Sequence, residues 1–326
     1  MRLVVLLVLL FGDGGWIPPA TPATLQYVVV SFDGAGDAAD VRRWSAVGEA
    51  TGARFTFLLS GVYLLAGDRA QLYRPPGHRR GASDIGFAIA FPGTDVRANI
   101  RDLVASLNEA DAAGHEVGSH FNGHFCGRSA GAVGTWGPDG WRREVTAFED
   151  LVRNVGANNE LPGLTTTFRA PVGARTPCLE GILAFERQAL ADAGYRYDAS
   201  EPADRAPYRT DGLWEIPIPL LDVAGTGYRT LAADYNLYLD QSHAEDADPA
   251  LWPSLRDQVL ATYRAYFWSH YDGARQPVIF AHHFEDWNGD IYSSALEQVL
   301  AEVCRVRDVR CVPYRDLIAA LDSMSR

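Results

Sequence analysis

Short apolar runs alternate with helical patterns along the chain, and this alternation restricts its fold more than any other feature. Residues 26–32 (QYVVVSF) form a mostly apolar, β-branched run, typical of a strand that is buried on both faces. Further strands are expected at residues 54–59, in the apolar stretch that leads into Gly118, and at residues 165–169, 195–198, 213–216, 277–281 and 309–312. Helices are expected at residues 40–51, 95–113, 141–154, 179–193, 251–271, 294–305 and 314–323. Strands that alternate with helices imply an α/β fold with a parallel sheet, and a chain of 326 residues can form it as one domain.

Side chains that can take part in catalysis or metal binding lie at the ends of several expected strands. They are Asp33, His120, Arg169, Asp198 and His283. The carboxyl ends of parallel strands meet at one face of a (β/α) barrel, and barrel enzymes place their active sites there. We therefore expect these five residues to share one site.

The start of the chain differs from the rest. A basic residue precedes an apolar run at residues 3–11, and small residues and proline follow. This order is typical of a secretory signal peptide, and the run is about half of the ~20 residues needed to span a bilayer. We expect residues 1–23 to be a signal peptide, cleaved after Ala20 or Ala23, and residues 24–326 to be a secreted or cell-wall-associated domain without a membrane span. An uncleaved anchor or a misassigned start is the alternative.

The chain is acidic, with a formal net charge of −12 at pH 7, and all of its basic residues are arginine. Nucleic acids and anionic membrane surfaces bind basic patches. The charge therefore argues against both as partners.

Residues 114–125 (GHEVGSHFNGHF) contain two histidines, His120 and His124, four residues apart after a short apolar strand signal. On one helical turn, residues at i and i+4 lie on the same face, so both imidazoles can bind one metal ion. Zinc accepts such a pair, usually with a third protein ligand and an open position for water or substrate. The alternative is a surface histidine pair on a helix.

The run GHEVGSHFNGH closely resembles the second motif of the polysaccharide deacetylase family, the NodB-homology domain of carbohydrate esterase family four. That motif reads roughly G-H-E-[IV]-x-x-H-[ST]-x-x-H, and Phe121 stands where Ser or Thr is usual. The resemblance extends over residues 26–320. It implies a distorted (β/α) barrel of the NodB type and a metal-dependent hydrolase that removes N-acetyl groups from glycans containing N-acetylglucosamine, such as peptidoglycan or chitin-like polymers.

The family's first motif typically reads T-F-D-D-G, with a general base followed by a metal ligand, whereas residues 31–37 read SFDGAGD. The resemblance implies that Asp33 is the base, while Gly34 replaces the second aspartate. Three alternatives follow: Asp33 binds the metal, Asp37 supplies the ligand, or fewer protein ligands hold the metal. Without the resemblance, Asp33 would be interpreted as a helix-capping or turn residue.

Residues 168–173 (FRAPVG) resemble the family's F-R-x-P motif. The resemblance implies that Arg169 orients the catalytic base and that Pro171 forms part of the site wall. A guanidinium can give a carboxylate two parallel hydrogen bonds and favour its ionised form. A surface salt bridge is the alternative.

Residues 195–198 (YRYD) resemble the fourth region of the family. The resemblance implies that Asp198 tunes a catalytic histidine and that Trp214 lines the groove. An aspartate after a strand is also a common helix cap, so this role stays open.

Residues 280–288 (FAHHFEDWN) resemble the fifth motif, which supplies a histidine as general acid to the leaving amine. Histidine suits this task because its pKa lies near working pH. The register leaves His282 or His283, and the N-H-F pattern of exported relatives favours His283. Aromatic residues that can stack on sugar rings or belong to the core are Trp136, Trp141, Trp214 and Trp287.

The cofactor implied by the resemblance is a divalent metal, with zinc as the default and cobalt or nickel as competitors. The mechanism implied by the resemblance is that the metal binds water and lowers its pKa, Asp33 removes a proton, and His283 protonates the amine. We expect a monomer that acts on a glycan. The alternatives are an inactive barrel that binds cell-wall glycan, and an O-acetyl esterase acting on xylan or a small molecule.

The four cysteines favour disulfides in an exported chain, although four buried thiols are the alternative. Cys304 and Cys311 are close in sequence at an expected helix-to-strand turn, so they can pair locally. Cys126 and Cys178 each follow a segment assigned to the site and would then pair across it. No CxxC spacing is present in the sequence, which argues against a cysteine-rich metal site.

Overall fold

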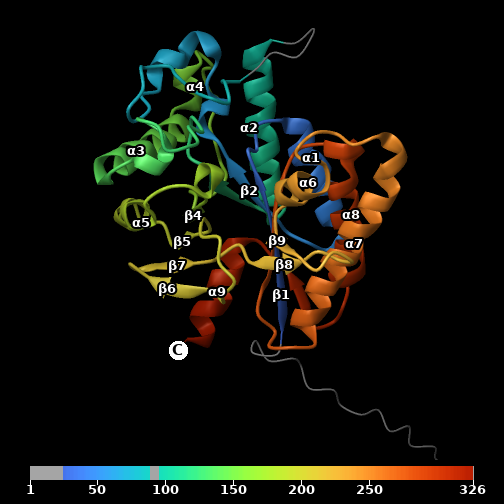
Figure 1. Cartoon of the computed structure of the whole chain (residues 1–326). Coiled ribbons are helices and arrows are strands. Elements are labelled where there is room, and N and C mark those ends of the chain that lie inside the picture. The colour runs from blue at the N-terminus through green and yellow to red at the C-terminus, as the bar shows by residue number, and fades with distance from the viewer. Residues whose placement is uncertain (1–24, 89–94, 326) are drawn as a thin grey trace, which may run out of the picture.

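The structure is a computed structural model that describes residues 25–88 and 95–325. The expected signal peptide and its cleavage sites lie outside the described residues. The parallel sheet expected from the sequence is present (Figure 1). Its strands are β1 (Gln26–Asp33), β2 (Thr56–Leu59), β3 (Glu116–Ser119), β4 (Gly173–Ala174), β5 (Tyr197–Asp198), β6 (Tyr208–Thr210), β7 (Leu213–Glu215), β10 (Val278–His283) and β11 (Val309–Cys311).

The strand order is β10-β1-β2-β3-β4-β5-β7-β6, and β11 pairs with the first half of β1. All pairings are parallel except that of β6 with β7. Because β10 and β6 stand at the two ends of this order, the described strands form a curled half-barrel rather than a closed one. This single-domain α/β architecture confirms the predicted fold class.

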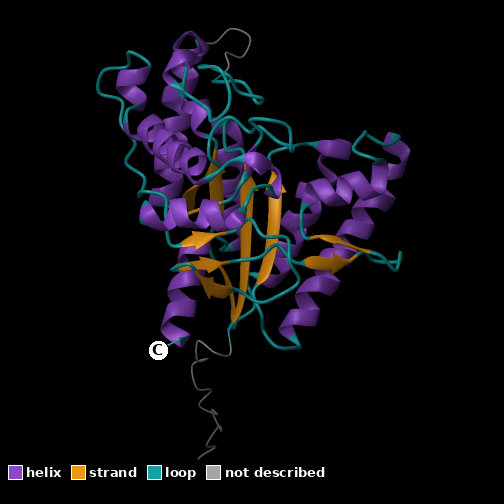
Figure 2. Cartoon of the chain, turned by 60° about the vertical axis from the view of Figure 1, so that its left-hand side comes forward, coloured by secondary structure: helices purple, strands orange, loops and turns teal. Residues whose placement is uncertain are grey.

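The central strand β1 is buried on both faces, as its mostly apolar sequence predicts: all eight of its residues are buried. Helices lie on both sides of the sheet in Figure 2, as expected for a parallel sheet. They are α1 (Ala38–Thr51), α2 (Val96–Ala112), α3 (Pro138–Arg153), α4 (Val155–Asn158), α5 (Leu183–Asp192), α6 (Asp234–Ser242), α7 (Trp252–Tyr271), α8 (Trp287–Val303) and α9 (Tyr314–Met324). Short 3₁₀ helices are η2 (Gly61–Leu64), η3 (Gly67–Leu72), η4 (Val133–Thr135), η5 (Pro177–Leu179) and η6 (Pro249–Leu251). No helix in the described ranges has the length and apolar character needed to cross a membrane.

The strand expected at residues 165–169 does not form. The amides of Thr167 and Phe168 instead donate to Asn108 Oδ1 of α2, at 2.7 and 3.1 Å. These amides are therefore bound to a helix side chain and cannot join a sheet ladder. The strand lies later, at β4, where Ala174 pairs with Ser119 of β3.

A small antiparallel pair and a helix, all missed in the sequence, precede α7. They are β8 (Leu220–Asp222), β9 (Arg229–Leu231) and α6. A bridge between Ala233 and Ala281 joins the start of α6 to β10. This bridge brings the first residue of α6, Asp234, to the end of β10.

Candidate active site

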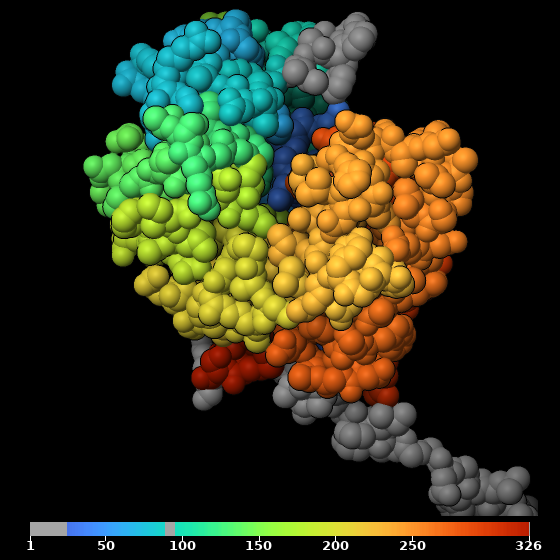
Figure 3. Space-filling view, viewed as in Figure 1, coloured from blue at the N-terminus to red at the C-terminus, as the bar shows by residue number. Residues whose placement is uncertain are grey.

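A pocket of about 530 Å³ opens at the carboxyl ends of β1, β3 and β10. Its polar lining includes four residues expected from the sequence: Asp33, His120, His124 and His283. In Figure 3 a hollow lies between the blue-to-green half of the surface and the orange segment, with dark-blue N-terminal residues at its floor. The structure thus brings these four predicted residues together.

Asp33 ends β1 and is held by a buried arginine, Arg175, that was not among the predicted site residues. Arg175 donates from Nη1 to Asp33 Oδ1 at 2.8 Å. Its Nε and Nη2 donate to the carbonyl of Ala199 at 2.9 Å and to the hydroxyl of Tyr314 at 2.7 Å. Burial is the largest influence and raises the pKa of Asp33, but the neighbouring positive charges, led by Arg175, and the Arg175 hydrogen bond together outweigh it and lower this pKa. Asp33 is therefore ionised at neutral pH and fixed in orientation.

The prediction that Arg169 orients this base is wrong. The Arg169 side chain is 63% exposed and pairs with Asp111 at 3.3 Å, which is the surface salt bridge named as the alternative. Pro171 likewise does not line the pocket. The prediction failed because the strand was expected at residues 165–169. The strand forms at β4 instead, and the residue that directly follows β4 is Arg175. Arg175-Thr176-Pro177 repeats the R-x-P spacing six residues later, and this repeat was the available signal.

His120 and His124 follow β3 in a loop, not on a helix as expected. Phe121 and His124 adopt left-handed backbone angles, with φ of 55° and 57°, and these angles turn the chain within the motif. The two imidazole centroids are 5.3 Å apart. The histidines therefore share one site through loop geometry rather than helical spacing.

Hydrogen bonds fix which ring nitrogen of each histidine is free. His120 Nδ1 lies 3.0 Å from the carbonyl oxygen of Arg175, and His124 Nδ1 lies 3.3 Å from Cys126 Sγ. A carbonyl and a disulfide sulfur carry no hydrogen, so both Nδ1 atoms are the protonated ones. Both Nε2 atoms keep their lone pairs, an arrangement typical of metal-binding histidines.

Burial also keeps both imidazoles neutral. It lowers the pKa of His120 to about 4, although the Asp33 charge acts in the opposite direction. Burial likewise lowers the pKa of His124, again against Asp33. A neutral imidazole binds a metal without first losing a proton, so this pair fits a divalent cation.

A third protein ligand beside this pair is not in place. Gly34 carries no side chain, and Asp37 caps α1 by accepting the Ala39 amide at 2.6 Å, outside the pocket lining. Asp37 is therefore a helix cap, and its predicted role as a metal ligand is not supported. In the described residues no trio of His, Cys, Asp or Glu that includes His120 has its ligand atoms within 4.8 Å of one another.

His283 ends β10 and faces the pocket with an aspartate behind it. Its Nδ1 lies 2.7 Å from Asp234 Oδ1, and its backbone amide donates to Asp234 Oδ2 at 2.8 Å. Burial alone would lower the pKa of His283, but the buried Asp234 carboxylate outweighs it and raises this pKa to about 9. The ring is therefore protonated at neutral pH.

Asp198 was expected to tune the histidine, and this prediction is wrong. Its carboxylate is fully buried, accepts the Ser200 amide at 3.0 Å and lies 3.5 Å from Arg187. Asp234 occupies the expected position instead. It lies 49 residues before His283, and no motif in the sequence marked it.

His282 does not line the pocket. Its Nε2 lies 2.9 Å from the Tyr263 hydroxyl and its Nδ1 lies 3.5 Å from Asp234 Oδ2. Successive strand residues point to opposite faces, so only one of the two histidines can face the pocket. This placement agrees with the preference for His283 as the catalytic candidate.

Of the four tryptophans considered for sugar stacking, Trp287 lines the pocket. Its ring is parallel to that of Tyr238 at 4.9 Å and lies 5.5 Å from the His283 ring. Trp214 instead donates to Asp322 and packs in the core, so its predicted role in the groove is wrong. Trp136 and Trp141 also belong to the core, with centroids 5.0 Å apart.

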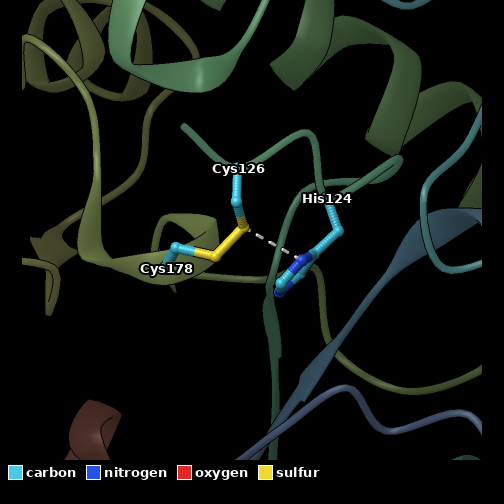
Figure 4. A group of neighbouring side chains, drawn as sticks. All are labelled: His124, Cys126 and Cys178. Atoms are coloured by element: carbon cyan, nitrogen blue, oxygen red, sulfur yellow. Dashed lines mark hydrogen bonds between the residues drawn. A yellow bond between two sulfur atoms is a disulfide. The ribbon is translucent and has the colours of Figure 1, made fainter. Parts of the chain in front are cut away.

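Both predicted disulfides are present, Cys126–Cys178 and Cys304–Cys311. Cys178 lines the pocket. Figure 4 shows the Cys126–Cys178 bond beside the His124 ring.

No family model matches the sequence, and no curated protein resembles it in sequence. Solved structures do resemble it. A candidate polysaccharide deacetylase from Mycobacterium smegmatis is 15% identical with a TM-score of 0.57, and the match covers 94% of each chain. A family 4 carbohydrate esterase from Streptomyces lividans, in complex with acetate, is 14% identical with a TM-score of 0.41, covering 87% of this chain and 91% of the other. The likeness to the first structure shows a shared fold and confirms the predicted resemblance at that level.

Proposed function

We propose that this chain is a hydrolase that removes N-acetyl groups from glycans containing N-acetylglucosamine, such as peptidoglycan or chitin-like polymers. The observation that carries the proposal is a pair of residues with opposite charges in one pocket. Asp33 is ionised beside Arg175, and His283 is protonated beside Asp234. The two are register partners on the adjacent strands β1 and β10. A general base and a general acid are thus side by side.

Each residue then has a defined proton to move. Asp33 accepts a proton from the water that attacks the acetyl carbonyl, and Arg175 holds its carboxylate in position. His283 donates its proton to the departing nitrogen, which leaves as an amine. Asp234 keeps His283 protonated until that step. This division of labour follows from the two pKa directions.

We further propose that His120 and His124 hold a divalent cation, zinc first and cobalt or nickel as alternatives. Their neutral rings and free Nε2 atoms support this. When bound, the cation would supply positive charge that polarises the carbonyl and stabilises the negative charge developing on it. Asp33 remains the base because Arg175 already holds its Oδ1 atom.

The aromatic wall supports a sugar substrate. Tyr235 is 42% exposed, and its ring lies 5.5 Å from that of Trp287. Such faces pack against the apolar side of a pyranose ring. We propose that the chain acts as a secreted or wall-associated monomer, and its two disulfides are compatible with export.

The test is acetate release from N-acetylglucosamine oligomers by the oxidised, zinc-loaded protein. Asp33→Asn and His283→Gln should each lose nearly all release while keeping the fold. Asp257→Asn, at a side chain that is 79% exposed, is the matched control and should retain it. Full activity in either pocket variant would refute the assigned roles.

A second candidate is an inactive barrel that binds cell-wall glycan, favoured by Gly34 and by the missing third ligand. It predicts glycan binding that a chelator leaves unchanged, with no acetate released from any glycan. An acetylxylan assay run in parallel separates the third candidate, an O-acetyl esterase. Release from acetylxylan but not from chitin oligomers would favour it.

A further inference from the structure

The geometry points to a second metal site beside the pocket, formed when one disulfide is reduced. We infer that His124, Cys126 and Cys178 then bind a thiophilic divalent cation such as zinc or cadmium. This second site shares His124 with the proposed histidine pair, but it does not depend on the proposed hydrolase activity, because it needs neither Asp33 nor His283.

The three side chains already converge. Their potential ligand atoms all lie within 4.8 Å of one another, and no other group of three in the described ranges does so. His124 Nδ1 points at Cys126 Sγ across 3.3 Å, and the dashed line in Figure 4 marks this contact. The Cα atoms of Cys126 and Cys178 are 6.0 Å apart. Small rotations of the side chains suffice to place two sulfurs and one nitrogen around a cation.

The chemistry of these groups depends on oxidation state. A disulfide offers no thiolate, so the oxidised chain cannot use Cys126 or Cys178 as strong ligands. A phosphine reductant gives two electrons to the S–S bond and becomes a phosphine oxide, while water supplies the oxygen and two protons for the thiols. Cation binding then displaces both thiol protons to solvent, and the His124 ring changes tautomer, losing the proton at Nδ1 and gaining one at Nε2, so that Nδ1 is free to bind. Two thiolates and one imidazole form the Cys₂His set found in zinc sites that keep an open position.

Contacts other than the disulfide hold the two segments together. The Gly127 amide, next to Cys126, donates to Glu180 Oε2 at 2.5 Å, two residues beyond Cys178. The Arg175 amide donates to the Ser119 carbonyl at 3.0 Å, within the β3–β4 edge. These bonds do not involve sulfur. The cysteines therefore remain neighbours after the S–S bond is broken.

His124 belongs to both arrangements. Its Nδ1 faces the sulfurs, while its ring also lines the pocket with His120. Metal bound to the reduced protein can therefore occupy either the sulfur site or the histidine pair, and only the sulfur site gives metal–thiolate bonds. The absence of CxxC predicted no cysteine metal site, but Cys126 and Cys178 are 52 residues apart and meet only in the fold.

Cadmium is the probe, because its bonds to thiolates absorb in the ultraviolet. The protein is a Cys304→Ser, Cys311→Ser variant, which leaves one disulfide, reduced with a phosphine that does not compete for the metal. We expect the charge-transfer band to saturate at one cadmium per chain, together with a native circular dichroism spectrum. The oxidised form of the same variant should give no band.

Three further variants locate the site. Replacing both Cys126 and Cys178 by serine should abolish the band, and His124→Ala should weaken cadmium binding at least about tenfold. His120→Ala is the matched control and should leave the band unchanged, although it disrupts the proposed catalytic pair. The two proposals therefore fail independently.

Three results would overturn this inference. A reduced, folded protein without the band overturns it, as does a band that survives loss of Cys126 and Cys178. Should reduction unfold the chain, cadmium must restore the native circular dichroism spectrum together with the band. A spectrum that cadmium does not restore also overturns the inference.

Discussion

Asp234 accepts two hydrogen bonds from His283, at 2.7 Å from the ring Nδ1 and at 2.8 Å from the backbone amide. One buried carboxylate thus fixes both the orientation of the ring and the end of β10. Because the helix dipole also places positive charge at the start of α6, a carboxylate is stabilised at this position. The carboxylate thereby favours the protonated form of the ring.

Replacing Asp234 with Asn should remove the negative charge that raises the pKa of His283. Burial and the Arg175 charge still lower this pKa, and of the neighbouring charges only Asp33 still raises it, so the pKa should fall from about 9 towards the ordinary histidine value of about 6.5. The alkaline limb of acetate release should move to lower pH, and the rate at pH 8.5 should fall more than tenfold. A pH–rate profile and NMR titration of the ring check this. Asp240→Asn, on the same helix, should change neither.

Arg175→Met should destabilise the protein and disturb Asp33. It removes a fully buried cation and leaves the Asp33 carboxylate buried without its partner, a loss of about 3–5 kcal/mol in related cases. The pKa of Asp33 should rise, so the acid limb of activity should move to higher pH. Arg169→Met is the matched control and should change the free energy of unfolding by less than about 0.5 kcal/mol. Equal effects of the two substitutions would contradict the reassignment of this role to Arg175.

Glu186→Gln should change how stability depends on pH. Glu186 is fully buried beside Asp198 and Glu215, and burial followed by these charges raises its pKa well above the usual value. The unfolded chain releases this proton near pH 4.3, whereas the folded chain retains it. The wild type should therefore lose up to about 1.4 kcal/mol of stability per pH unit above that point, relative to the variant.

Urea unfolding at pH 5 and pH 8 measures this difference. We expect Glu186→Gln to gain stability over the wild type on going from pH 5 to pH 8. Glu49→Gln, at an exposed position of α1, should show no such change. A difference between wild type and Glu186→Gln that is the same at both pH values would show that Glu186 is ionised in the fold.

His120→Ala should abolish both zinc binding and acetate release. Mass spectrometry of the oxidised protein, purified without a histidine tag, should find close to one zinc per wild-type chain and none in the variant. His270→Ala, at a half-buried position of α7 outside the pocket, should retain the metal. A wild-type chain that stays metal-free after incubation with zinc would favour the glycan-binding alternative.

Local patterns predicted the ends of β1 and β10 correctly, whereas partners distant in sequence were missed. The apolar runs of β1 and β10 placed Asp33 and His283, because burial of a whole strand leaves a clear signal. Arg175 binds a carboxylate 142 residues away, and such pairs have no local signature. The three threonines at 165–167 predicted a strand, but two amides of this segment donate to the Asn108 side chain instead of to a neighbouring strand. Because this contact joins distant residues, the sequence placed the strand too early, and the wrong arginine, Arg169 instead of Arg175, was assigned to the site.

Gly34 offers the most direct test of the metal hypothesis. It lines the pocket where the resembled family has a metal-binding aspartate, and a Cβ built there meets nothing within 4 Å. Its φ of +79° is left-handed, a conformation that aspartate tolerates better than most residues. Gly34→Asp should therefore fold, at a cost of about 1–2 kcal/mol, and place a carboxylate next to His120 and His124.

A third ligand should strengthen zinc binding by at least about tenfold, measured by competition with a chromogenic chelator. Gly34→Ala also places a Cβ on this left-handed backbone but adds no carboxylate, so it should leave the affinity unchanged. Combining Gly34→Asp with His120→Ala should cancel the gain, because the aspartate then lacks the histidine pair. Equal affinity in the Asp and Ala variants would mean that a carboxylate at position 34 does not reach the metal, and would contradict the placement of a metal site beside Gly34.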